Sequence, residues 1–323
     1  MRTASQLVLR TKPFARELRW LSWWHFGSTL AALAALLGLA CLHVPWWARL
    51  TISVLAGLTM VRMFTIFHDH QHGTILRGSR PAGALLGAFG LLLLTPPSIW
   101  RRTHNHHHGQ NGRLPAASVG SFRVMTTRAF TCASRRQKLA YALSRHPLTI
   151  LTGYATVFLY GMCLHPLLLR PRHHADGALA LLLHAALVTA LAVWAPALLV
   201  WALLVPFGVA TALGSYLFYA QHNFPGAWFH EGARPDGAAA ALTGSSYMPM
   251  GPILRWFTGN IGYHHVHHLN PRIPFYRLPE AMAGIRELQS PRVTTLSPRG
   301  IYRCLRLKLW DPEQQRLVSF ARR

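Results

Sequence analysis

The sequence ARLTISVLAGLTMVRMFTIFHDHQH, residues 48–72, decides the class of the fold. Residues 48–67 are almost wholly apolar, and their number matches the roughly 20 residues that a helix needs to cross a bilayer. His68, His70 and His72 follow directly. Imidazole is the commonest protein ligand of transition metals, so an apolar span that ends in three histidines predicts a metal site at a membrane surface.

Three further apolar stretches have the length of a membrane span. Each pair of neighbouring stretches is separated by a short turn that contains a proline, Pro45 in the first pair and Pro196 in the second. The sequence therefore predicts an all-α membrane protein with four transmembrane helices in two hairpins. The predicted spans are about Trp24–His43, Ala48–Phe67, Ala178–Trp194 and Ala197–Phe218.

Two shorter apolar segments are predicted to lie in the membrane interface. Ala82–Leu94 is too short to cross, and Pro96 and Pro97 close it. Leu148–Leu169 has an ambiguous length. If it crossed the membrane, the histidines before it and those after the second hairpin would lie on opposite sides. A single metal site therefore requires that Leu148–Leu169 stay in the interface and that all the histidine clusters share one side.

The charge pattern gives the orientation of these spans. The chain has 33 Lys and Arg against nine Asp and Glu, a net charge of +24, and 51% of its residues are apolar. Nearly all the basic residues fall on the histidine side, which the positive-inside rule places in the cytosol. This distribution disfavours a nucleic-acid binder, because the basic residues flank membrane segments. We expect both termini in the cytosol, no cleaved signal peptide, and a basic face suited to an acidic electron-transfer partner.

The histidines are concentrated in three clusters, or boxes, and one lone position. Residues three or four apart share a face of a helix, so each box can aim two or three imidazoles at one point. The intervening His70, His106 and His265 are expected to point elsewhere. The predicted ligands are His68 and His72; His104, His107 and His108; His222; and His264, His267 and His268.

Eight or nine imidazoles exceed the four ligands of one zinc and suit two metals with open positions for a small molecule. Ligand type alone leaves iron, copper and zinc open. A carboxylate-bridged site is disfavoured, because only Asp69 adjoins a box. We expect Asp69 to accept a hydrogen bond from an imidazole and orient it. Asn260 is a second candidate near the metals, and for both residues a purely structural hydrogen bond remains an alternative.

Two longer motifs carry a family resemblance. LRWFTGNIGYHHVHHLNPRIPFYRLPEA, residues 254–281, resembles the bacterial acyl-lipid, methyl-end desaturases, and LFYAQHNFPGAWF, residues 217–229, is similar to their lone-histidine motif. The order HxxxH, HxxHH, HxxHH resembles the integral-membrane fatty acid desaturase superfamily, which also includes hydroxylases. The resemblance covers about residues 20–285. His70 departs from the pattern, since relatives often have a small residue or cysteine there.

The resemblance implies a non-haem di-iron centre on the cytosolic side, O2 as co-substrate, and a cis double bond placed in a fatty acyl chain. It assigns the nine predicted ligand histidines to the two irons. It also implies a lipid or thioester substrate drawn from the bilayer and a bacterial plasma membrane location. With no haem-binding HPGG segment in the chain, we expect electrons from a separate ferredoxin- or cytochrome-like donor.

We divide the chain into a basic interfacial arm (1–22), a desaturase domain (23–285) and a basic C-terminal tail (286–323). A hydroxylase on the same scaffold is the nearest alternative, because one oxidant can either take a second hydrogen or add oxygen. A histidine-rich metal transporter is a remote alternative, since it would need polar residues along its spans and these spans are mostly aliphatic. The position of the double bond, the chain length, the carrier of the acyl group and the oligomeric state stay open.

Overall fold

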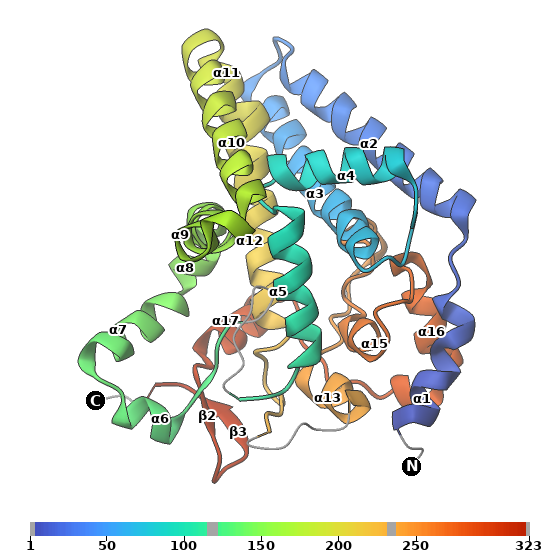
Figure 1. The fold of residues 1–323 in the computed structure, drawn as a ribbon, viewed down its shortest axis with the longest axis vertical. Helices are drawn as coiled ribbons and strands as arrows, with labels where there is room; N and C mark the ends of the chain where they lie inside the picture. Colours follow the sequence, from blue (N-terminus) through green and yellow to red (C-terminus); the bar gives the residue numbers. More distant parts are fainter. Residues whose placement is uncertain (1–3, 115–121, 231–236, 321–323) are drawn as a thin grey trace.

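A computed structural model describes residues 4–114, 122–230 and 237–320. The described chain is mostly helical (Figure 1). Four of its helical stretches are long and apolar enough to cross a membrane, which confirms the all-α membrane fold and the number of predicted spans. These stretches are α2 (Arg19–Ala40), α3 (Trp46–Gln71), α10 (Ala175–Trp194) and the continuous run Pro196–Ala220, which comprises α11 (Pro196–Leu198), the π-helix η4 (Leu199–Leu204) and α12 (Val205–Ala220).

The four spans form two antiparallel hairpins. The α2–α3 and α10–α11 turns lie at one end of the molecule, whereas α1 (Ala4–Thr11) and the strands lie at the other (Figure 1). Helix α3 is central and packs against both α2 and α12. Gly57 permits the second contact, because a Cβ atom there would lie only 2.6 Å from the carbonyl oxygen of Pro206. The hairpins therefore join along α3 and α12 into one body.

Helix α3 extends further than its apolar stretch. It continues to Gln71, so His68 and His70 lie on the helix rather than after it, and His72 is its C-cap. The helix ends where Gly73 adopts a φ of +67°, a conformation that glycine tolerates best. Helix α2 likewise begins at Arg19, before the predicted start at Trp24. Hydropathy located both spans. It did not locate these helix ends, because polar residues continue both helices beyond their apolar stretches.

Helices α4 (Arg80–Leu92) and α5 (Pro97–Gly109) correspond to the predicted interfacial segment and the second box. Only the two helices together are long and apolar enough to cross a membrane, and they are bent by 88° relative to each other at the break before Pro97. Proline at the first helical position suits α5, since its missing N–H would be unpaired there anyway. The bend turns α5 along the other helices and carries the second box toward α3 (Figure 1).

The segment predicted to lie in the interface is broken into three parts. They are α8 (Pro147–Leu151), the π-helix η2 (Tyr154–Leu164) and α9 (His165–Leu169). Its apolar helical part, Tyr154–Leu169, is shorter than the four spans. This length agrees with the parity argument, which requires the segment not to cross.

Arg62 is the one charged side chain in the middle of α3, and it faces the protein interior. It is 3% exposed and contacts two other helices. Its Nε donates to Thr29 Oγ1 at 3.0 Å, an Nη group donates to the carbonyl of Trp256, and the guanidinium lies 4.4 Å from the Trp256 ring. The buried arginine thus ties α2, α3 and α14 together instead of reaching for the interface.

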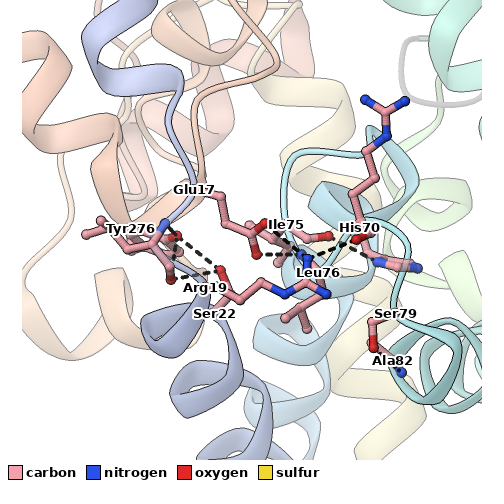
Figure 2. Close-up of polar contacts among 11 residues, drawn as sticks. Glu17, Arg19, Ser22, His70, Ile75, Leu76, Ser79, Ala82 and Tyr276 are labelled. Carbon is pink, nitrogen blue, oxygen red and sulfur yellow. Dashed lines mark hydrogen bonds and ion pairs between the residues drawn. The ribbon is translucent and has the colours of Figure 1, made fainter.

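The N-terminal segment is fastened to the loop that follows α3 (Figure 2). Glu17 Oε1 accepts the N–H of Leu76 at 2.6 Å, which holds a residue whose φ is +51°. Arg19 donates to the carbonyl of Arg77 at 2.9 Å, and the Tyr276 hydroxyl lies 3.1 Å from Ser22 Oγ. The predicted arm is therefore packed against the histidine side, although residues 1–3 fall outside the described chain.

A cap covers the histidine side of the spans. It includes a three-stranded sheet that the sequence did not predict, in the order β1-β2-β3, with β1 parallel to β2 and β2 antiparallel to β3; Met125 pairs with Leu309 and Trp310 with Leu317. The cap elements are η1 (Lys12–Ala15), β1 (Met125–Thr126), α6 (Thr127–Cys132), α7 (Arg135–Ser144), η3 (Pro171–His173), α13 (Gly237–Gly244), α14 (Pro252–Phe257), α15 (His264–Leu269), η5 (Phe275–Arg277), α16 (Leu278–Gly284), η6 (Arg286–Leu288), α17 (Pro298–Arg306), β2 (Leu309–Asp311) and β3 (Arg316–Val318).

The segment predicted as a C-terminal tail is folded as far as residue 320. Cys304 and Trp310 are buried in one apolar cluster with Phe224 and Leu217 from the region of the lone histidine. The tail thus packs against the end of α12 and the residues that follow it, and its last three residues fall outside the described chain. The three-part division of the chain stays a prediction.

Candidate metal centre

Nine histidine side chains meet where α3, α5, α12 and α15 converge. In each of two groups, the ligand-type nitrogens lie within 4.8 Å of one another, and these groups contain the nine predicted ligands. We call them cluster A and cluster B. Cluster A is His68, His72, His104, His108 and His267; cluster B is His107, His222, His264 and His268.

The structure divides the second and third boxes between the clusters, whereas the spacing predicted one target for each box. Successive residues are about 100° apart around the axis of a helix. The first and last histidines of each box, which are four residues apart, therefore point in similar directions. The histidine directly before the last one points to a different side of the helix. His104 and His108 accordingly face cluster A while His107 faces cluster B. His264 and His268 face B while His267 reaches across to A. Each of these boxes thus serves both clusters.

Helix geometry explains the position of the other predicted histidines. His70 belongs to neither cluster, and its Nδ1 donates to the carbonyl of Ile75 at 3.1 Å (Figure 2). His265 is fully buried and lies 3.3 Å from the carbonyl of Leu288. His106 is exposed. The expectation that these three point elsewhere is confirmed.

The distances between imidazole nitrogens fit shared metal ions. His68 Nε2 lies 2.8 Å from His104 Nε2, and His108 Nε2 lies 3.0 Å from His104 Nε2. In cluster B, His264 Nε2 lies 2.8 Å from His222 Nε2. Two nitrogens bound at right angles to one metal at about 2.1 Å would lie about 3.0 Å apart. The clusters therefore have the spacing of cis ligands around a metal.

His72 supplies a separate indication for cluster A. Its ring stands edge-on to His68, with the centroids 4.6 Å apart. Its Nε2 is buried and has no hydrogen-bond partner among the described residues. A buried polar atom normally finds a partner, because leaving it unpaired costs about 1–3 kcal/mol. A metal ion in cluster A would satisfy this nitrogen.

Burial keeps the cap histidines in the neutral form that binds metals. Desolvation lowers the pKa of His222 to about 4, and the hydrogen bond to a backbone carbonyl opposes this shift only partly. Desolvation and the neighbouring imidazoles hold the pKa values of His264, His267 and His268 well below their usual range. At neutral pH these rings therefore carry a free lone pair rather than a second proton.

Two contacts fix the orientation of ligand imidazoles. Asp69 Oδ1 accepts a hydrogen bond from His68 Nδ1 at 3.0 Å, which leaves Nε2 of that ring for cluster A. His222 Nδ1 donates to the carbonyl of Gly244 at 2.9 Å, which leaves its Nε2 for cluster B. The second contact was not predicted, because every residue has a backbone carbonyl and the sequence does not show which one will face His222.

Asn260 lies one step away from the clusters. Its Nδ2 donates to the carbonyl of Phe275 at 3.1 Å, and the N–H of Phe275 donates to Asp69 Oδ2 at 2.7 Å. Its φ of +56° places it in a left-handed turn just before α15. Asn260 therefore holds the loop that holds Asp69. A role of either residue in metal binding stays a prediction.

Trp100 was missed by the sequence reasoning. Its ring is fully buried and stacks on His104 at a centroid distance of 4.6 Å and an interplanar angle of 14°. Trp100 lies four residues before His104 on the same helix, so the spacing was the signal that could have found it. Phe64 approaches the Trp100 ring edge-on, with the ring centroids 4.9 Å apart. These aromatic rings form an apolar wall beside cluster A.

An apolar cavity of about 40 Å³ lies between α3 and α12 and touches both clusters. His68 and His104 of cluster A line it, as do His107 and His264 of cluster B. Its remaining walls come mainly from the two spans and are apolar. They include Val61, Phe64, Gly214, Leu217, Phe218 and Ile261.

The chain matches proteins that act on fatty acids. The family model of fatty acid desaturases matches residues 44–299. A fatty acid desaturase from Bacillus subtilis (strain 168) is 33% identical over 283 residues, which cover 86% of this chain and 79% of that protein. An sn-1 oleoyl-lipid 12-desaturase from Picosynechococcus sp. is 26% identical over 274 residues, or 80% of this chain and 75% of the relative. Delta(8)-fatty-acid desaturase 2 from Arabidopsis thaliana is 26% identical over 277 residues, or 77% of this chain and 59% of the relative.

Proposed function

This chain belongs to the fatty acid desaturase family, and from that premise we propose that clusters A and B hold two iron ions for O2-dependent formation of a cis double bond in a fatty acyl chain. It is a membrane oxidoreductase that acts on fatty acyl substrates. Bound at the clusters, the iron pair would supply the oxidising power that removal of hydrogen from a methylene group demands. The observation that carries the proposal is the apolar cavity that touches both clusters.

The cavity suits a hydrocarbon chain beside the clusters. The part of its wall outside the histidines is nearly all apolar, as it is in pockets that bind apolar groups. An acyl chain that enters from the bilayer is already out of water, so the cavity holds it by van der Waals contact and shape. Because histidines of both clusters line the cavity, a pair of adjacent carbons inside it would lie beside both clusters.

The protein's own groups position the reaction and keep it dry. Phe64 and Phe218 narrow the cavity and exclude water, so hydrogen removal does not compete with side reactions in solvent. Asp69 and the Gly244 carbonyl hold His68 and His222 in fixed orientations, as supporting partners of metal ligands do. Fixed geometry is what allows one position along a uniform chain to be chosen.

The clusters face the cytosol in this proposal. The positive-inside rule favours that orientation, since the basic residues flank the histidine side of the spans. In a bacterial plasma membrane, the acyl chain would enter from the bilayer and a separate ferredoxin- or cytochrome-like donor would approach from the cytosol. The form of the substrate, whether lipid or thioester, is left open.

Iron content tests the proposal. Protein purified in detergent and loaded with Fe(II) without oxygen is expected to hold two irons per chain by atomic emission. His107→Ala is expected to lower this value and abolish product formation, because it removes a cluster B ligand that lines the cavity. His106→Ala, on the same helix but exposed, is the matched control and should change neither. Full iron loading and normal product with His107→Ala would refute the ligand assignment.

A further inference from the structure

A groove on the cytosolic cap is used by nothing described so far. Helix α17 and strand β3 form its sides, and four arginines line it: Arg299, Arg303, Arg306 and Arg316. All four are exposed. Among the described residues, none of them takes part in a salt bridge and no acidic residue lines the groove. The groove is thus an uncompensated positive surface.

The sequence of α17 concentrates this charge. Arg299, Arg303 and Arg306 follow one another at spacings of four and three, so they share one face of the helix. Cys304 lies on the opposite face and is fully buried against the cap core. Like charges at such spacings repel one another and destabilise a helix. An anionic partner in the groove would reverse this cost.

The floor of the groove is connected to cluster B. Leu307 lines the groove, and its carbonyl accepts hydrogen bonds from Asn223 Nδ2 at 3.0 Å and from the Tyr219 hydroxyl at 2.8 Å. Asn223 follows His222 directly in the chain. One hydrogen bond and one short stretch of backbone therefore lead from the groove to a histidine of cluster B.

From this arrangement we infer that the groove docks an acidic one-electron carrier of the ferredoxin class and passes its electrons through Leu307 and Asn223 to His222. The inference rests on the proposed function and adds the docking surface of its electron donor and the route to cluster B. Each turnover joins one –CH₂–CH₂– unit, one O2, two protons and two electrons to give –CH=CH– and two waters. Two reduced ferredoxins supply those electrons, and each is oxidised by one electron.

The position of the groove favours a soluble protein over a membrane surface. The β2–β3 hairpin lies at the end of the molecule opposite the α10–α11 turn, away from the spans (Figure 1). Tyr302 is exposed beside the arginines, and the guanidinium of Arg306 lies 5.5 Å from its ring. Arginine and tyrosine are enriched among the residues that dominate protein–protein binding energy. Charge complementarity with an acidic partner then raises the rate of encounter.

The test is turnover of the iron-loaded enzyme with two electron sources. One source is a reduced acidic plant-type [2Fe–2S] ferredoxin, and the other is dithionite with methyl viologen, which needs no docking site. Arg303→Glu/Arg306→Glu is expected to raise the apparent KM for ferredoxin about tenfold or more and to leave mediator-supported turnover unchanged. The Kd of oxidised ferredoxin, measured by isothermal titration calorimetry without turnover, is expected to rise by a similar factor. The matched control Arg135→Glu/Arg136→Glu changes the net charge equally on exposed positions of α7 and should leave both unchanged.

Other outcomes overturn the inference. It fails if both double variants change the KM for ferredoxin equally, or if wild-type enzyme accepts mediator electrons but not ferredoxin electrons. If Arg303→Glu/Arg306→Glu lost mediator-supported turnover only in nanodiscs rich in anionic lipid, the groove would bind lipid headgroups instead. Wild-type enzyme that is inactive even with the mediator would contradict the proposed function itself. Should the reversal variant fold poorly, Arg303→Gln/Arg306→Gln takes its place, with an expected increase of about threefold.

Discussion

Asp69 joins the two parts of the protein that build cluster A. One of its carboxylate oxygens accepts from His68 on α3, and the other accepts from the backbone of Phe275, beyond α15. A carboxylate in this position fixes the tautomer of the imidazole and makes it a better metal ligand. It is also the acidic residue that adjoins a histidine box, so its placement was predicted from the sequence.

Asp69→Asn is therefore expected to weaken iron binding to cluster A. The amide keeps the size of the side chain but loses the charge that supports His68, and such changes typically cost about 10–100-fold in metal affinity. Titration with Fe(II) under anaerobic conditions measures the effect. Asp311→Asn is the control, because Asp311 accepts the N–H groups of Glu313 and Gln314 in a turn between β2 and β3. Equal affinity of Asp69→Asn and wild type would show that the hydrogen bond is only structural.

At the scale of the helix, the sequence predicted where the spans lie but not where every histidine points. Hydropathy located the four spans, and the i, i+4 spacing paired His104 with His108 and His264 with His268. The spacing wrongly aimed His107 and His267 at the same point as the other members of their boxes, because the target of each histidine becomes clear only when the neighbouring helices are placed. The Gly244 carbonyl was invisible for the same reason, since its role depends on the fold of a distant loop.

The contact between α3 and α12 depends on Gly57. A side chain there would meet the backbone of Pro206 and the side chain of Val209 at 2.6 and 2.8 Å. Gly57→Leu is expected to destabilise the protein by about 1–3 kcal/mol, because helix backbones cannot yield as a flexible side chain can. Thermal unfolding in detergent checks this against Gly27→Leu on α2, where a Cβ atom meets nothing within 4 Å. Equal stability of the two variants would contradict the close packing.

Gly214 on α12 limits the cavity in a different way. A Cβ atom there would make ordinary contact with Phe158 at 3.6 Å, so the fold should accept a substitution that fills the cavity. Gly214→Leu is expected to reduce turnover of the longest acyl chains about tenfold and to spare shorter ones, since displaced methylenes lose their site. Product analysis over a series of chain lengths measures this, with Gly208→Leu as control. An equal loss of turnover at all chain lengths would contradict a role of this cavity in holding the acyl chain.

At the scale of the whole molecule, two natural cysteines report the orientation of the hairpins. Cys41 is exposed at the end of α2, beside the α2–α3 turn, and Cys132 is exposed at the end of α6 in the cap. Cys163 and Cys304 are buried. If the chain crosses the membrane four times, both turns within the hairpins lie on the side opposite the histidines. Cys41 and Cys132 then lie on opposite sides of the membrane.

We expect a membrane-impermeant maleimide to label Cys41 in spheroplasts, and to label Cys132 only after the membrane is opened. Cys41→Ser and Cys132→Ser identify the labelled site in each case. Labelling of Cys132 in sealed spheroplasts would place the histidine clusters outside the cytosol. Equal access to both cysteines before opening would contradict the two-hairpin topology.

The most direct test of the central claim is the fatty acid profile of host membranes. Gas chromatography–mass spectrometry, with derivatisation that locates double bonds, compares cells with wild-type protein, with His267→Ala, and without the protein. Our account predicts a new species two mass units below its parent acyl chain with wild type alone, because two hydrogens are removed and nothing is added. A hydroxylated product, 16 mass units above the parent, or an unsaturated product that persists with His267→Ala, would contradict it.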